Sequence, residues 1–147
     1  MMKITACLIL LMPLSIAAQD TVGDKIVEYT LSKEGKKIDR GECWDLVSEA
    51  LNRSGANWDP PTGFGDKIDY TKDEVLPGDI IELKNAKISA DNWTYQFPQH
   101  YAVIVEVLGD RRYRIGHQNY NNKRKVGLME LNLNYLRKGK VTVYRPG

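Results

Sequence analysis

The sequence lacks a surplus of charge of either sign. Its 147 residues include 21 Lys and Arg against 19 Asp and Glu, a net charge of +2, which is far below the basic excess typical of proteins that bind a phosphate backbone. We therefore expect no nucleic-acid partner. Twelve glycines and six prolines are too few for a low-complexity or collagen-like chain. With 42% hydrophobic residues, the chain suits one globular domain and is too short for a multidomain arrangement.

The sequence also lacks a hydrophobic run long enough to span a bilayer. The apolar run from Ile4 to Ile16 is shorter than the roughly 20 residues that a transmembrane helix needs. Lys3 precedes this run and small residues end it, a pattern typical of a secretory signal peptide. We expect residues 1–18 to be removed, which leaves a domain over 19–147 with no stable membrane anchor. The protein is then expected to be exported, either periplasmic or secreted.

Cysteine is scarce as well. Removal of the predicted signal peptide takes away Cys7 and leaves Cys43 as the single thiol, which excludes an intramolecular disulfide. An unpaired cysteine in an exported protein is inert and buried, paired between molecules, or retained for the chemistry of its thiol. Close pairs of metal ligands, such as CxxC or HxxxH, are absent from the sequence. Because zinc sites commonly use such pairs, we expect no metal and no organic cofactor.

Helical periodicity comes before β-type patterning along the chain. Helices are expected over residues 24–34 and 42–53. Turn-forming residues predict loops over 56–74 and 84–98. Short apolar runs predict strands over residues 80–83, 101–108, 113–119, 125–131 and 141–144. Helices first and strands afterwards indicate an α+β fold, with N-terminal helices packed on a C-terminal antiparallel sheet.

The last strands form a predicted hairpin that gathers polar side chains. If Gly109 and Asp110 are the two turn residues, Ala102 lies opposite His117, and His100 lies opposite Asn119. Because side chains alternate with period two along a strand, both histidines and Asn119 then share one face. A three-residue turn would separate them.

These residues are the components of a thiol nucleophile and its base. Cys43 is expected at a helix N-terminus, where the helix dipole and a nearby imidazolium would lower the pKa of a thiol from about 8.5. His100 would take the proton, and His117 or Asn119 would orient its ring. An unperturbed histidine titrates near pH 6.5, so activity that depends on neutral His117 should fall in mild acid. Taken singly, each residue also fits an ordinary structural role, as a buried thiol, a hydrogen-bonded histidine or a turn asparagine.

Four segments resemble the CHAP and NlpC-like cysteine peptidases and amidases. They are GECW at 41–44, LPGDII at 76–81, HYAVIV at 100–105 and YRIGHQNYN at 113–121. The resemblance implies a papain-like fold, with Cys43 as the nucleophile and His100 as the base. It places His117 at the third position, where CHAP members commonly carry a carboxylate and NlpC-like members often carry a histidine. It also implies cleavage of amide bonds in peptidoglycan.

We therefore expect an exported, monomeric cysteine hydrolase that cleaves peptide or amide bonds, in peptidoglycan or another peptide substrate. Trp93 and Tyr95 are expected to line the substrate cleft or, equally, to pack as structural residues. One alternative is a catalytically silent module with the same fold that binds wall peptides or a protein. Another is a secreted antibacterial toxin, which would share the chemistry.

Overall fold

The computed structural model describes residues 18–147, and the expected signal peptide lies outside them except for its last residue. In this described part of the chain, two helices precede a sheet of six strands. The elements are α1 (Val22–Ser32), α2 (Cys43–Ser54), β1 (Asp66–Ile68), β2 (Ile80–Ala90), β3 (Trp93–Gly109), β4 (Arg112–His117), β5 (Gly127–Asn132), a 3-10 turn η1 (Leu133–Tyr135) and β6 (Leu136–Arg145). Within the described range, no helix is both long and apolar enough to cross a membrane.

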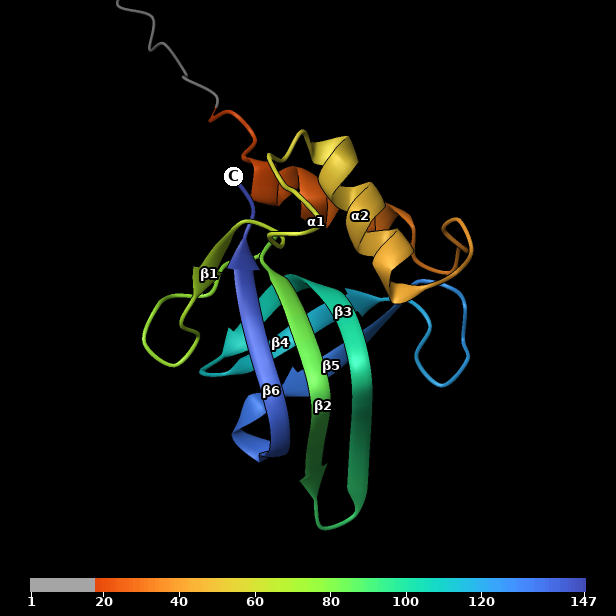
Figure 1. Cartoon of the computed structure of the whole chain (residues 1–147), viewed down its shortest axis with the longest axis vertical. Coiled ribbons are helices and arrows are strands. Elements are labelled where there is room, and N and C mark those ends of the chain that lie inside the picture. The colour runs from red at the N-terminus through yellow and green to blue at the C-terminus, as the bar shows by residue number, and fades with distance from the viewer. Residues whose placement is uncertain (1–17) are drawn as a thin grey trace, which may run out of the picture.

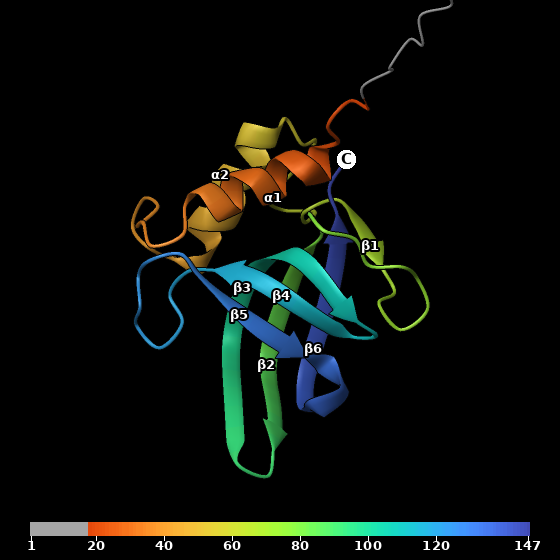
Figure 2. The same ribbon diagram turned by 180° about the vertical axis from the view of Figure 1, so that it is seen from behind.

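All neighbouring strands pair antiparallel, in the order β1-β6-β2-β3-β4-β5. The two helices lie together across one end of the sheet, and the β2–β3 hairpin extends away from them (Figure 1). Seen from behind, α1 runs above β3 and β4 (Figure 2). The expected α+β fold, with N-terminal helices packed on a C-terminal antiparallel sheet, is confirmed.

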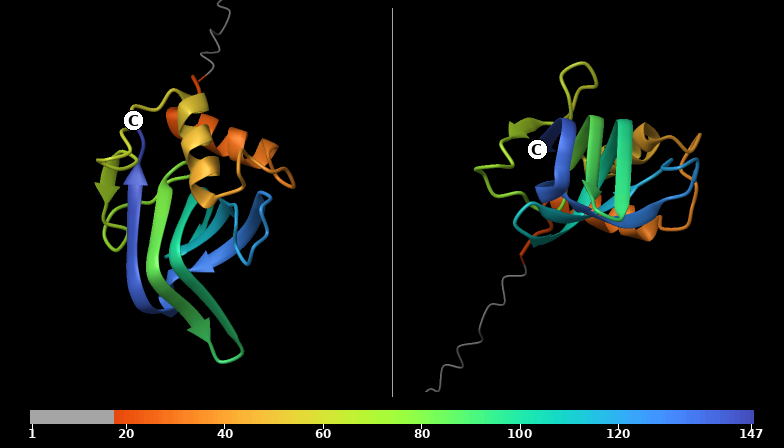
Figure 3. Two further views of the ribbon diagram at one scale, coloured as in Figure 1. Left: turned by 45° about the vertical axis from the view of Figure 1, so that its right-hand side comes forward. Right: turned by 90° about the horizontal axis from the view of Figure 1, so that it is seen from below.

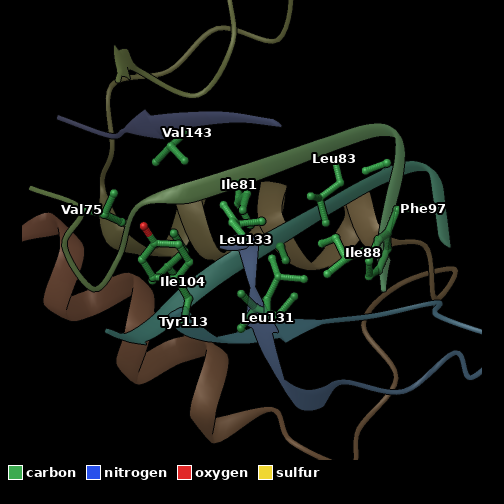
Figure 4. Packing of buried hydrophobic residues seen from close by; sticks show 13 residues of the cluster. Val75, Ile81, Leu83, Ile88, Phe97, Ile104, Tyr113, Leu131, Leu133 and Val143 are labelled. Carbon is green, nitrogen blue, oxygen red and sulfur yellow. The ribbon is translucent and has the colours of Figure 1, made fainter. Parts of the chain in front are cut away.

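The sheet is strongly bent, because β4 and β5 turn away from the plane of β6, β2 and β3 (Figure 3). Alternate side chains therefore enter two different cores. Ile81 and Ile104 belong to the cluster inside the bend (Figure 4), whereas Ile80 and Val103 belong to the cluster beneath the helices. The strands thus bury both faces at the end of the sheet that meets α1 and α2.

Local sequence explains where the two helices begin. Thr21 caps α1, and its side chain and that of Asp24 form a reciprocal capping box. Glu42 and Asp45 form the corresponding box at α2. Gly55 ends α2 in the left-handed conformation that favours glycine. Both helices start and stop within two residues of their predicted bounds.

The loop predicted over residues 84–98 is wrong, since this segment forms most of the β2–β3 hairpin. Asp91 and Asn92 are the turn between the two strands. Asn85 has a positive φ of 49° and lies where the pairing of β2 with β6 shifts register. This irregularity interrupts the alternation of apolar residues that would have indicated a long strand. Two smaller differences are β1, which lies inside the predicted 56–74 loop, and β6, which begins five residues earlier than expected.

The predicted pairing of Ala102 with His117 is confirmed, but the turn is different. Gly109 pairs with Arg112, so the turn residues are Asp110 and Arg111 instead of Gly109 and Asp110. Two register shifts along β3 compensate for this displacement and restore the predicted pairing at Ala102. The expected pairing of His100 with Asn119 is wrong, because β4 ends at His117 and Asn119 turns out of the strand with a φ of 59°.

Gly78 lies in the turn before β2 and packs closely against Gly23 at the start of α1, which provides a test of this contact. Its φ is 96°, and a Cβ there would overlap the backbone of Gly23. Gly78→Ala should therefore lower the free energy of unfolding by about 3 kcal/mol, measured by denaturant titration. Gly109→Ala is the matched control, because no atom lies within 4 Å of the Cβ position there. Equal effects of the two substitutions would contradict this account.

Candidate active site

Two histidines from adjacent strands meet inside the bend of the sheet. His100 of β3 and His117 of β4 are 3% and 7% exposed, and His100 Nε2 lies 2.9 Å from His117 Nδ1. The rings of Phe97 and Tyr120 pack against this pair at centroid distances of 5.4 Å and 5.6 Å. The expected contact between the two histidines is therefore present, in an aromatic enclosure.

Burial keeps both histidines neutral at ordinary pH. Burial, and then the charge of His117, lower the pKa of His100 to about 3. Burial lowers the pKa of His117 to about 4. The expectation that His117 titrates near pH 6.5 is thus wrong, because the apolar enclosure disfavours imidazolium. Two neutral imidazoles fit a bond in which one ring nitrogen donates and the other accepts.

Cys43 is the first residue of α2 and lies against β3. Burial raises the pKa of its thiol, and the Glu42 carboxylate also raises it, while hydrogen bonds from backbone N–H groups, first that of Tyr101, lower it. The effect of the Tyr101 N–H on this pKa indicates that the sulfur lies near the residue that follows His100. The predicted lowering of the thiol pKa is not found, because desolvation outweighs the helix N-terminus.

Asn119 does not bond to His100. Its Nδ2 donates to Glu42 Oε2 at 2.7 Å, and Arg124 donates to the other carboxylate oxygen of Glu42 at 2.6 Å. Asn119 and His100 line a common cavity of about 160 Å³. Asn119 therefore ties the loop after β4 to the N-cap of α2, next to the thiol.

Gln118 is a site residue that sequence reasoning missed. It is 1% exposed, its Nε2 donates to the carbonyl oxygens of Ile38 and Glu42, and its Oε1 accepts from the N–H of Ile38. These bonds join the residue after His117 to the residue before Cys43. One sequence signal could have indicated this role. Because side chains alternate along a strand, Gln118 is directed away from the His117 face and toward the helices.

The two predicted cleft aromatics, Trp93 and Tyr95, lie in different surroundings. Tyr95 and His117 line one cavity of about 330 Å³. Trp93 packs on Tyr95 and Tyr135, beside the turn of the β2–β3 hairpin, and does not line that cavity. Within residues 18–147, no group of three or more Cys, His, Asp or Glu side chains could hold a metal ion.

The fold, with a cysteine at the start of a helix and histidines on the sheet, defines a cysteine proteinase-fold domain. Residues 15–147 match the family model described as the AIM3/BBC1 cysteine proteinase-fold domain, and the chain belongs to this family.

A curated relative is altered inheritance of mitochondria protein 3 from Debaryomyces hansenii, which is 30% identical over 153 residues. The match covers 89% of this chain but 16% of the relative's length. The expectation of a periplasmic or secreted protein is wrong, because this relative is a yeast protein named for the inheritance of mitochondria.

Solved structures of low sequence identity share the fold. The crystal structure of Ly7917 with the hydrolyzing product of MDP has a TM-score of 0.56 and 17% identity, covering 87% of this chain and 64% of that one. A second crystal structure of Ly7917 has a TM-score of 0.53 and 18% identity, covering 85% and 62%.

The raised thiol pKa predicts slow alkylation. In a Cys7→Ser background, Cys43 is the single thiol, and at pH 7 it should react with iodoacetamide more slowly than free cysteine because less of it is thiolate. The rate should rise with pH to a midpoint above that of free cysteine. Mass spectrometry of samples quenched at successive times gives the rate, and a midpoint at or below that of free cysteine would refute the prediction.

Because both histidines are neutral in the folded protein, the free energy of unfolding should decrease in mild acid. Each has a lower pKa in the folded protein than the 6.5 of an unfolded chain, so the unfolded state binds more protons and stability falls as the pH drops from 6.5 toward about 4. The lowered pKa values of Asp24 and Asp45, by contrast, affect stability only from about pH 4 downward, near the ordinary carboxyl range.

Denaturant titrations at pH 7, 6, 5 and 4.5 measure this slope. The chain has two histidines, and both belong to the pair. A His100→Gln/His117→Gln variant should therefore show a flatter profile than the parent protein. Equal slopes for parent and variant would show that the histidines are not the groups that titrate.

Proposed function

We propose that this domain is a thiol hydrolase that cleaves peptide or amide bonds, with Cys43 as nucleophile, His100 as base and His117 as the residue that orients His100. The observation that supports it most directly is the 2.9 Å bond between His100 Nε2 and His117 Nδ1. The backbone N–H of Tyr101 lowers the pKa of the Cys43 thiol, so the sulfur lies near the same strand. The likeness to CHAP and NlpC-like enzymes supports an amide as the bond that is cleaved.

The His100–His117 bond selects one useful tautomer in this proposal. If Nε2–H of His100 donates to Nδ1 of His117, then Nδ1 of His100 carries a lone pair and can accept the thiol proton. His117 acts as an orienting group only while its own Nδ1 is unprotonated. Its pKa of about 4 maintains that state at neutral pH.

The charge states favour a general-base mechanism for the proposed hydrolase. Because burial raises the pKa of the thiol and lowers that of His100, the resting pair is a neutral thiol and a neutral imidazole. His100 takes the proton as Cys43 Sγ attacks the carbonyl carbon, and backbone N–H groups at the start of α2 stabilise the oxyanion. The proton passes to the leaving amine, and water then hydrolyses the thioester.

A second candidate function is a binding domain that retains the fold without turnover. The raised pKa of Cys43 favours it, because a recognition module needs no thiolate at neutral pH. The yeast relative is named for altered inheritance of mitochondria. Turnover distinguishes the two candidates.

Hydrolysis is tested by incubating the protein with a capped peptide mixture and, separately, with purified peptidoglycan, and identifying the products by mass spectrometry. Cleavage in either sample should disappear in Cys43→Ala. His117→Ala should lower kcat about a hundredfold, the magnitude expected for a general-base system. No cleavage of either substrate by the parent protein would favour the binding domain.

Asn119→Ala is the matched control for His117. Because the Asn119 amide bonds Glu42 rather than His100, its loss should reduce activity less than the loss of His117. Circular dichroism of each variant establishes that it is folded. If Asn119→Ala costs a hundredfold while His117→Ala is nearly silent, Asn119 is the orienting residue and the assignment above is wrong.

A further inference from the structure

Three consecutive basic residues follow β4, and they face different parts of the structure. Arg124 bonds the Glu42 carboxylate and the Arg40 carbonyl, so its side chain is directed toward the start of α2. Lys123 and Lys125, on either side of it, instead line the cavity of about 330 Å³ that contains His117. Neither lysine forms an ion pair with any residue of the described range. Their charges are therefore available to a ligand.

The same cavity has an apolar side, and none of the described residues that line it is acidic. Tyr95 and Tyr120 contribute rings, and Leu128 and Met129 of β5 contribute aliphatic surface. Within residues 18–147, the remaining lining residues are Gln118, Asn121 and Gly127, so this described wall contains no carboxylate. A volume of this size is at the small end of ligand sites. Cations beside an apolar surface suit a segment that carries a carboxylate next to an apolar side chain.

A neighbouring loop adds positive charge at the same end of the molecule. The loop between β4 and β5 lies beside the loop between α1 and α2 in both Figure 1 and Figure 2. Backbone bonds from Val126 to Lys36 and from Gly35 to Val126, each 2.8 Å, join them. This second loop carries Lys36 and Lys37, which form no ion pair within the described range, together with Arg40, which pairs with Asp39 and Asp45. The two free lysines add positive charge on the loop that is bonded to the lysine-bearing segment, and such charge attracts anions.

We propose that the cavity lined by Lys123, Lys125 and His117 is a specificity subsite for acidic peptides, which binds a carboxylate side chain next to an apolar one. The inference deepens the proposed hydrolase by naming its substrate class, and in that respect it rests on that proposal. The lysines bind the carboxylate, while Tyr95 and Met129 pack against the apolar neighbour. His117 lies in the wall of this cavity and also bonds His100, so a peptide held here lies next to the histidine pair.

Equilibrium binding tests the subsite separately from turnover. The probes are two peptides, acetyl-Ala-Phe-Glu-Ala-amide and acetyl-Ala-Phe-Gln-Ala-amide, titrated into the Cys43→Ala protein and followed by NMR. The Glu peptide should bind about tenfold more tightly than the Gln peptide in 20 mM salt, as expected for two solvent-accessible ion pairs. The difference should vanish in 0.5 M salt, where charges are screened, and also in a Lys123→Glu/Lys125→Glu variant.

The matched control is Lys138→Glu/Lys140→Glu, which makes the same change in net charge on exposed positions of β6. It should leave the preference for the Glu peptide within about twofold of the parent, since screened charges that are remote from the cavity contribute little. Equal affinities for the two peptides in the parent, no saturable binding of either peptide, or a preference that survives Lys123→Glu/Lys125→Glu would each overturn the subsite. Because these measurements need no thiol, they stand even if the parent protein hydrolyses nothing.

Discussion

The buried amide of Gln118 links the two layers on which the site depends. Its hydrogen bonds to Ile38 and Glu42 connect the end of β4 to the start of α2. His117 precedes this amide in the chain, and Cys43 follows Glu42. A buried polar side chain with several hydrogen bonds is costly to displace, because each group left unpaired carries a desolvation penalty. The link therefore fixes the helix that carries the thiol against the sheet that carries the histidines.

Exclusion of water then determines the charge state of the site. The enclosure by Phe97 and Tyr120 leaves the two histidines nearly inaccessible, and within residues 18–147 no carboxylate acts on the pKa of either ring. The thiol is affected in the same direction, because burial favours its neutral form. A preformed thiolate–imidazolium pair is therefore disfavoured, and in the proposed hydrolase the proton would move only as a substrate carbonyl is attacked. This is the physical difference between the resting site and the ion pair that helix-dipole arguments alone predict.

Local signals predicted the helices and part of the sheet. Caps and periodicity act within a few residues, so the bounds of α1 and α2 were predicted to within two residues. The β2–β3 hairpin was missed because the irregularity at Asn85 breaks the alternation on which strand prediction depends. The pairing of Ala102 with His117 was predicted correctly from an incorrect turn, since two extra residues in β3 offset the displacement of the turn. Such register shifts depend on packing across the bent sheet and cannot be predicted from local sequence patterns.

The sequence by itself determined which chemical groups are present and roughly where they lie: a thiol at a helix N-terminus, and two histidines on adjacent strands. It also indicated the fold class, because helices followed by strands have few ways to bury their apolar faces. Only the tertiary structure decided that Asn119 bonds Glu42, that Gln118 joins the layers and that both histidines are neutral. Hydrogen-bond partners about 80 positions apart and the burial of a ring are set by the whole packed chain, so no short segment of sequence encodes them.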